Sequence, residues 1–255
     1  MRRILFSLVV LLNTSLAIAE EATTEATTEA TKPWSVDLTT SFFSDYMWRG
    51  FNLYDGASIQ PSFTGTYDTG YGEISGNLWL HLSAEGDRQA EKFFEMDETI
   101  SYAYDFDPLK VTIGHVWYTY PDSDDQIVDS AEVFASLAFD DSKLNEFFSL
   151  APKLTVYQDY RVTDSQYYGL GFSHAFESAA LGEGFNITPY VELGFASNAE
   201  KVYSDSGGLV QVSYSVSSTL NLGDIEVIPC LNYTSKVDDA TTNEFWFGAG
   251  LNYSF

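Results

Sequence analysis

The sequence predicts an all-β protein, a transmembrane up-and-down antiparallel β-barrel of about twelve strands. Three observations predict this fold. The chain ends in an alternating strand, and turn signals recur between further alternating segments. No stretch reaches the roughly 18 consecutive apolar residues of a membrane-spanning helix. The predicted barrel domain covers residues 34–255.

The C-terminal strand carries the strongest signal. From Phe245 to Phe255 the odd positions are Phe, Phe, Ala, Leu, Tyr and Phe, and the even positions are mostly Gly, Asn and Ser. One face of this strand is therefore apolar, which invites aggregation in a soluble protein but suits lipid contact in a barrel. A final Phe resembles the C-terminal signature that bacterial outer-membrane proteins present to the barrel-assembly machinery. The signature residues predicted here are Phe245, Phe247, Leu251, Tyr253 and Phe255.

The N-terminal region has the organisation of a Sec signal peptide. Two arginines precede an apolar run at residues 4–12, and Ala17-Ile18-Ala19 forms a small-x-small cleavage site. We expect residues 1–19 to be removed by cleavage after Ala19. Residues 20–33 repeat Ala, Thr and Glu without an aromatic side chain, which predicts a disordered periplasmic lead.

Turn signals divide the remaining chain into hairpins. One set is short, as periplasmic turns are, and the other is longer and more polar, as extracellular loops are. The short set lies at residues 68–70, 105–108, 140–143, 181–184 and 221–224. The longer set lies at residues 54–57, 83–91, 121–129, 161–165, 197–208 and 235–242. Because the two sets alternate, we expect both termini on the periplasmic side.

Apolar residues alternate with polar ones in most of the predicted strands. Leu38, Phe63, Leu78 and Val133 have outward parity, for example, and the opposite parity carries carboxylates and amides. The pattern is weaker at residues 110–120 and 209–222, where the sequence does not define the outward face.

The charge balance restricts the partners. The chain has 12 Lys and Arg against 37 Asp and Glu, and loss of two arginines with the signal peptide leaves 10 − 37 = −27. Nucleic acids and polyanions are therefore poor partners, and small cations or neutral solutes fit better. Aromatic residues make up 16% of the chain, which is typical of contact with membrane interfaces, lipid and lipopolysaccharide. Cys230 is the only cysteine, so no internal disulfide or CxxC motif is possible.

Polar residues of inward parity predict an acidic lumen. Rings of acidic side chains favour cations in pores. A barrel of about twelve strands lies between eight-stranded barrels, which side chains fill, and the wide channels of roughly 16–18 strands. We expect a narrow, cation-preferring channel for passive diffusion of small solutes. The predicted pore-lining residues are Asp45, Arg49, Glu73, Glu95, Asp97, Glu132, Asp159 and Glu192. The alternatives are a non-conducting structural or adhesive barrel with a filled lumen, and a secreted β-sandwich.

Arg49 has two interpretations. It follows Trp48 near the end of the first predicted strand, where an arginine can extend to the membrane interface. Alternatively, it projects into the lumen, pairs with carboxylates such as Asp45 or Glu95, and narrows the pore.

Nothing in the sequence indicates an enzyme. The three histidines, His81, His115 and His174, accompany no recognisable nucleophile motif. The acidic loop at residues 122–129 lacks the glycine and the distal glutamate of an EF-hand. It is interpreted as a solvated loop, or alternatively as a site for divalent cations that bridge lipopolysaccharide. We expect no catalytic residue, metal site or cofactor.

Short aromatic segments along the chain carry a family resemblance. They include Ser44-Asp45-Tyr46, Trp48-Arg49-Gly50, Gln60-Pro61, Glu95-Met96-Asp97, Tyr118-Thr119-Tyr120-Pro121, Glu132-Val133-Phe134 and Tyr157-Gln158-Asp159-Tyr160. In this order they resemble the TorF-type (Gcw_chp) family of bacterial outer-membrane porins. The resemblance implies an outer-membrane barrel that acts as a channel. It supplies no catalytic residues and no defined substrate.

Overall fold

The computed structural model describes residues 32–84, 94–121, 128–144, 148–177 and 186–255. The predicted cleavage at Ala19 and nearly all of the predicted lead lie outside these residues, as does most of the acidic loop. No helix in the described ranges is both long and apolar enough to span a membrane.

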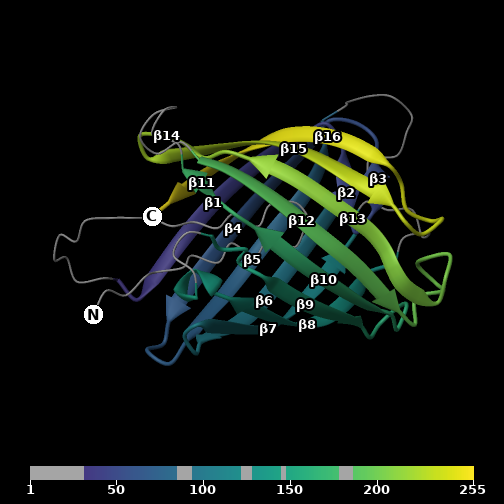
Figure 1. Cartoon of the computed structure of the whole chain (residues 1–255), viewed down its shortest axis with the longest axis horizontal. Coiled ribbons are helices and arrows are strands. Elements are labelled where there is room, and N and C mark those ends of the chain that lie inside the picture. Colours follow the sequence, from purple (N-terminus) through teal and green to yellow (C-terminus); the bar gives the residue numbers. More distant parts are fainter. Residues whose placement is uncertain (1–31, 85–93, 122–127, 145–147, 178–185) are drawn as a thin grey trace.

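Twelve long antiparallel strands form a closed barrel (Figure 1). They are β1 (Trp34–Phe43), β4 (Ser58–Asp68), β5 (Glu73–Ser83), β6 (Glu95–Asp105), β7 (Leu109–Thr119), β8 (Ser130–Phe139), β9 (Lys153–Asp159), β10 (Gln166–Ser173), β12 (Asn186–Ser197), β13 (Gly207–Ser217), β15 (Ile225–Lys236) and β16 (Glu244–Ser254). The first and last strands pair, with Leu38 opposite Tyr253, and this pairing closes the sheet. The predicted fold class is confirmed, and the secreted β-sandwich is wrong.

Three short elements lie beside the strands of the barrel wall. Strand β11 (Phe176–Glu177) pairs with β12, and β14 (Leu220–Leu222) pairs with β15, so both add a short strand to the barrel wall. A single 3-10 turn, η1 (Asp141–Lys143), follows β8, and the side chain of Asp140 caps it.

Side chains alternate between the two faces of the barrel wall. Leu38, Phe63, Ile100, Val133 and Phe247 point outward and are exposed, as contact with lipid requires. The inner face carries small hydroxyl and amide side chains, among them Ser41, Ser62, Thr64, Thr99, Ser101, Ser136, Ser213, Ser215, Asn232 and Asn252. A polar interior and an apolar exterior are the arrangement expected of a membrane barrel.

A β-bulge explains why the sequence pattern is weak near residue 210. Gly194 pairs with Gln211, but the next residue, Phe195, pairs with Leu209, so Val210 is an extra residue in β13. A bulge changes the parity of the strand. Leu209 and Tyr214 consequently both face outward although one number is odd and the other even.

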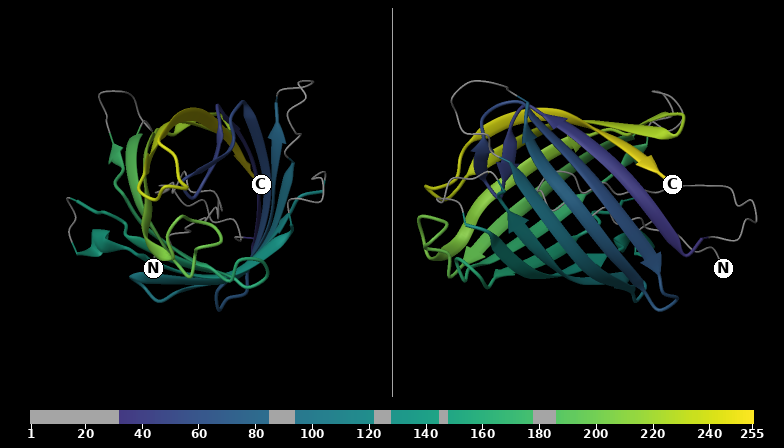
Figure 2. Two further views of the ribbon diagram at one scale, coloured as in Figure 1. Left: turned by 90° about the vertical axis from the view of Figure 1, so that its right-hand side faces the viewer. Right: turned by 180° about the vertical axis from the view of Figure 1, so that it is seen from behind.

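A separate two-stranded sheet lies inside the barrel. Strands β2 (Tyr46–Trp48) and β3 (Phe51–Tyr54) pair with each other and form a hairpin immediately after β1. The start of β1 and the C-terminus lie at one end of the barrel, and the hairpin enters from the opposite end, which we call the distal end (Figure 2). This hairpin differs from the sequence-based prediction, in which its first residues close the first strand.

Apolar packing in the lumen supports the hairpin. Met47 contacts a buried cluster of Phe43, Ile228, Cys230 and Trp246 on the inner wall. Tyr46 stacks on His81 of β5, with ring centroids 4.7 Å apart. These contacts hold the hairpin against β1, β5, β15 and β16, and its tip extends across the lumen.

Candidate lumen site at the distal end

The tip of the hairpin requires an unusual backbone. Arg49 and Gly50 have φ values of 45° and 93°, in the left-handed region that favours glycine. A Cβ at Gly50 would also approach the side chains of Thr241 and Gln211 within 2.8–3.0 Å. The carbonyl of Gly50 accepts a 2.9 Å hydrogen bond from the N–H of Thr242. The tip is thereby fixed to the loop at residues 237–243.

Arg49 crosses the lumen to the opposite wall. Its Nη1 and Nη2 each lie 2.8 Å from a different carboxylate oxygen of Glu132, on β8. The Tyr118 hydroxyl donates a further 2.8 Å hydrogen bond to the same carboxylate. Arg49 and Glu132 are only 5% and 4% exposed, so this is a buried, bidentate ion pair.

Aromatic rings surround the guanidinium. Its central carbon lies 4.5 Å from the ring centroid of Trp48, 4.3 Å from that of Tyr157 and 4.6 Å from that of Tyr167. These distances are within the range of cation–π attraction. The guanidinium of Arg49 is therefore held by one carboxylate and three aromatic rings.

Two loops cover the hairpin at the distal end. The Tyr203 hydroxyl, in the loop at residues 198–206, donates to the carbonyl of Arg49 at 3.2 Å. Asp238, in the loop at residues 237–243, accepts hydrogen bonds from the backbone N–H groups of Ser204, Asp205 and Ala240. We call the hairpin and these two loops the distal constriction.

The environment of Asp238 favours its charged form. Burial raises the pKa of this carboxyl, but hydrogen bonds from the N–H groups of Ser204, Ala240 and Asp205 lower it by more. The pKa of Asp238 therefore lies below its ordinary value. The two loops are joined through an ionised carboxylate.

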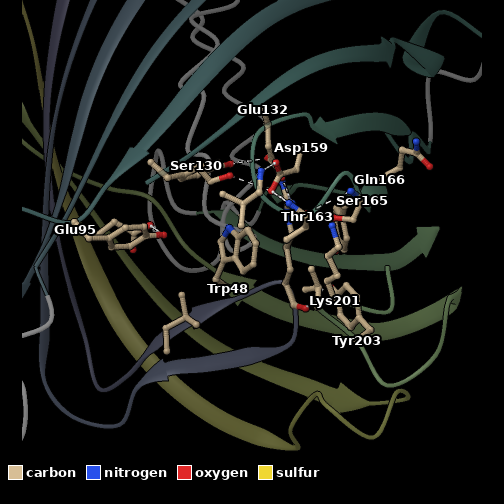
Figure 3. A pocket seen from close by; sticks show the side chains of 17 residues that line it. Trp48, Glu95, Ser130, Glu132, Asp159, Thr163, Ser165, Gln166, Lys201 and Tyr203 are labelled. Carbon is tan, nitrogen blue, oxygen red and sulfur yellow. Dashed lines mark hydrogen bonds and ion pairs between the residues drawn. The ribbon is translucent and has the colours of Figure 1, made fainter. Parts of the chain in front are cut away.

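A cavity of about 330 Å³ lies beside the ion pair (Figure 3). Strands β6–β10, the hairpin and the loop at residues 198–206 all contribute to its wall. The lining residues are Trp48, Arg49, Leu53, Glu95, Tyr118, Tyr120, Ser130, Glu132, Asp159, Val162, Thr163, Ser165, Gln166, Tyr167, Lys201, Val202 and Tyr203. Figure 3 shows Glu95 on one side of Trp48 and Asp159 on the other.

Asp159 has a structural role at the rim of the cavity. Its carboxylate accepts N–H hydrogen bonds from Arg161 and Val162 at 2.8 and 2.9 Å. The hydroxyls of Thr163 and Ser130 donate to it as well, at 2.8 and 3.0 Å. These donors occupy both oxygens of Asp159 and hold the turn after β9.

Glu95 differs from the other two carboxylates of the cavity. Its Oε1 accepts a 3.1 Å hydrogen bond from the Tyr120 hydroxyl, but its Oε2 is buried and has no partner among the described residues. Asp97, two residues along the same face of β6, likewise has a buried Oδ1 without a partner in the described structure. Both side chains are only 2% exposed.

The remaining predicted pore residues are distributed along the barrel. Asp45 accepts hydrogen bonds from Ser44 and Asn52, at 2.6 and 3.4 Å, near the base of the hairpin. Glu73 lies at the start of β5, away from the distal end, where Lys110 pairs with it at 2.9 Å. The predicted set therefore forms no single site, although Arg49, Glu95, Glu132 and Asp159 meet at one cavity.

Glu192 belongs to a second buried network. The hydroxyls of Tyr167 and Tyr190 each donate to its carboxylate at 2.9 Å, and the Gln211 amide lies 3.3 Å from it. Tyr167 also contacts Arg49 through its ring, so this network adjoins the ion pair.

The tyrosines of the site are functional candidates that were not predicted from the sequence. Tyr118 and Tyr120 bind the carboxylates of Glu132 and Glu95, and Tyr157, Tyr167 and Tyr203 surround Arg49 or hydrogen-bond to it. Of these tyrosines, Tyr157 shares the parity of Asp159 in β9, and this parity was the available signal for it.

The histidines lie apart from one another. His81 is fully buried against Tyr46. His115, on β7, contacts the Tyr160 hydroxyl through its Nε2 atom, and His174 contacts the Ser149 carbonyl through its Nδ1 atom. The structure brings no two of them together. Within the described ranges, no group of three or more His, Cys, Asp or Glu residues could hold a metal ion.

Comparisons with known proteins agree with the fold. The family model described as "Bacterial protein of unknown function (Gcw_chp)" matches residues 27–201. An outer membrane channel from Pseudomonas putida F1 has a TM-score of 0.56 at 10% identity, covering 89% of this chain and 97% of that one. LpxR from Salmonella typhimurium has a TM-score of 0.51 at 10% identity, covering 86% and 99%. No curated protein matches the sequence.

Proposed function

This chain belongs to the Gcw_chp family of bacterial proteins and is a barrel of the outer membrane, and from this we propose that it is a channel for small solutes. Solutes would cross by passive diffusion, with a preference for cations. The single observation that carries the proposal is an inner wall of hydroxyl and amide side chains with carboxylates at the distal end, enclosed by an apolar outer wall.

Charge supports the preference for cations. Glu95 and Asp97 are buried on the inner wall without an ion-pair partner among the described residues. Ionised carboxylates on the wall of a confined lumen attract cations and repel anions. The basic residues Arg49 and Lys110 are each paired with a glutamate, which reduces their effect on a passing anion.

The distal constriction would regulate this channel. The hairpin narrows the lumen, and its tip is held by the pair between Arg49 and Glu132. We infer that breaking this pair frees the tip and widens the passage. The shape of the open state would then depend on how far the hairpin moves.

A non-conducting barrel is the second candidate. The hairpin and both loops hydrogen-bond to one another across the distal end, which also suits a filled lumen. In that case the protein would act through its distal loops.

Single-channel recording tests the proposal. We would refold the mature chain, insert it into a planar bilayer with a salt gradient, and compare the wild-type protein with Arg49→Ala. The proposal expects stable conductance steps with a cation-selective reversal potential, and larger or longer openings in the variant. A folded barrel that stays silent in both forms would support the second candidate.

The remaining assignments are also proposals. We infer that the protein is not an enzyme, that residues 1–19 are removed by cleavage after Ala19, and that the termini are periplasmic. Phe255 and the outward aromatic residues of β16 would bind the barrel-assembly machinery, and lipid and lipopolysaccharide would surround the outer wall.

A further inference from the structure

The cavity beside the ion pair has exposed apolar side chains in its wall. Leu53, on strand β3 of the hairpin, is 37% exposed, and Val162, in the turn after β9, is 40% exposed. Trp48 and Val202 line the same cavity. Because Leu53 lies inside the barrel, lipid does not cover it as it covers the outer wall. A cluster of exposed apolar side chains beside polar groups is typical of a binding site.

The charged side chains of the cavity are already compensated. Arg49 and Glu132 bind each other, and Asp159 accepts hydrogen bonds from the donors around it. Glu95 is only 2% exposed, and its Oε2 has almost no accessible surface to offer a ligand. Lys201 is exposed, so water solvates its ammonium group and an ion pair there would contribute little. A charged ligand would therefore lose hydration in the cavity without a buried counter-charge, which disfavours cations and anions alike.

The hydroxyl groups of the cavity use their hydrogens within the protein. Since Thr163 donates to Asp159, the hydroxyl shared between Thr163 and Ser165 comes from Ser165. The other hydroxyl donors are Tyr118 to Glu132, Tyr120 to Glu95, Ser130 to Asp159, Tyr167 to Glu192 and Tyr203 to the carbonyl of Arg49. A hydroxyl oxygen that has donated its hydrogen still accepts hydrogen bonds. The wall therefore suits a ligand that carries a hydroxyl donor.

We propose that this cavity binds a small neutral aromatic alcohol. Its ring would pack against the apolar and aromatic surface of Trp48, Leu53 and Tyr118, and its hydroxyl group would donate to an oxygen of the wall. The volume of about 330 Å³ is near the lower limit for ligand pockets, which restricts the ligand to a small molecule. The inference goes beyond conduction, because it requires only the cavity and holds for an open or a closed lumen.

Calorimetric titration of the folded, mature protein in detergent tests this inference, with empty micelles as the blank. Three ligands share one ring: benzyl alcohol is neutral, benzylammonium is positive and benzoate is negative. We expect saturable binding of one benzyl alcohol per barrel, about tenfold tighter than either ion, because the ions lose hydration without a buried counter-charge. Equal binding of the three ligands, tighter binding of either ion, or no saturable binding of benzyl alcohol would overturn the inference.

Two matched variants locate the site. Leu53→Asp removes apolar surface from the wall and adds a charge, and we expect it to weaken benzyl alcohol binding about fivefold or more. Leu144→Asp makes the same change at a leucine that is 75% exposed, follows η1 and does not line the cavity. It should bind like the wild type. Unchanged affinity in Leu53→Asp contradicts the assignment, and if that variant does not fold, the three ligands on the wild-type protein still decide it.

Conductance separates this inference from the proposed function. A barrel that is silent in bilayers but binds benzyl alcohol more tightly than both ions would refute the channel and retain the site. A conducting barrel that binds the three ligands equally, or binds none of them, would retain the channel and refute the site.

Discussion

Arg49 and Glu132 are 83 residues apart in the chain, yet they form a two-point ion pair inside the barrel with both N–O distances at 2.8 Å. Arg49 stands on the tip of an internal hairpin, and Glu132 stands on the wall strand β8. This contact fixes the tip of the hairpin to the wall of the barrel.

Removal of one member of this pair should be strongly destabilising. We expect Arg49→Met or Glu132→Gln to lower the free energy of unfolding by about 3–5 kcal/mol, because each leaves a buried charge or buried donors unpaired. The double variant should lose less than the sum of the two singles. Urea unfolding of the barrel in lipid vesicles measures these differences.

A more exposed pair provides the control. The side chains of Glu73 and Lys110 are 27% and 15% exposed. Glu73→Gln breaks their contact and should lower the free energy of unfolding by only about 0–1 kcal/mol. Equal losses at Glu132 and Glu73, or strictly additive losses in the double variant, would contradict the importance of the buried pair.

Ion selectivity should depend on the inner face of β6. Asp97→Asn should reduce the preference for cations about fivefold, since one charge close to a passing ion in water contributes about 1 kcal/mol. Reversal potentials under a potassium chloride gradient measure this effect. Glu98→Gln alters the neighbouring residue, which faces outward and is exposed, and should leave the potential unchanged. The same shift in both variants would count against a lumenal role.

Acid should release the two distal loops. Hydrogen bonds to the charged form lower the pKa of Asp238, so its contribution to stability is present above the unfolded value of about 3.9 and is lost as the pH falls through the lowered folded value. We expect the amides of Ser204 and Asp205 to be protected from hydrogen exchange at neutral pH, and to lose protection only in strong acid.

Variants of the loop test this assignment. Asp238→Ala should remove the protection of both amides at neutral pH. Asp239→Ala changes the adjacent carboxylate, whose side chain is 90% exposed, and should retain it. Protection that persists in Asp238→Ala would show that other contacts hold the loops.

Gly248 should resist substitution. A Cβ at this position would collide with the Phe43 ring and the Phe42 carbonyl, inside the cluster that supports the hairpin. We expect Gly248→Ala to lower the free energy of unfolding by about 1–3 kcal/mol, the usual cost of overpacking. Gly76 also lies within a strand, but a Cβ there has no atom within 4 Å, so Gly76→Ala should cost much less. Similar losses in urea unfolding would be inconsistent with this packing.

Much of the barrel could be predicted because alternation is local. The outward residues of β16 and the turns between strands follow from a period of two and from turn chemistry. The prediction was weak around residue 210 because the bulge at Val210 depends on pairing between β12 and β13, which no single strand reveals.

The sequence by itself determined the apolar outer face, the polar inner face and the acidic character of the lumen. Only the tertiary structure decided that residues 46–54 fold back as an internal hairpin, that Arg49 pairs with Glu132, and that Glu95 and Glu132 line one cavity. The physical reason is the distance along the chain between the residues that decide each feature. The face of a strand is set by neighbouring residues, whereas contacts across the lumen depend on barrel closure, which brings residues far apart in the chain into one small enclosed volume.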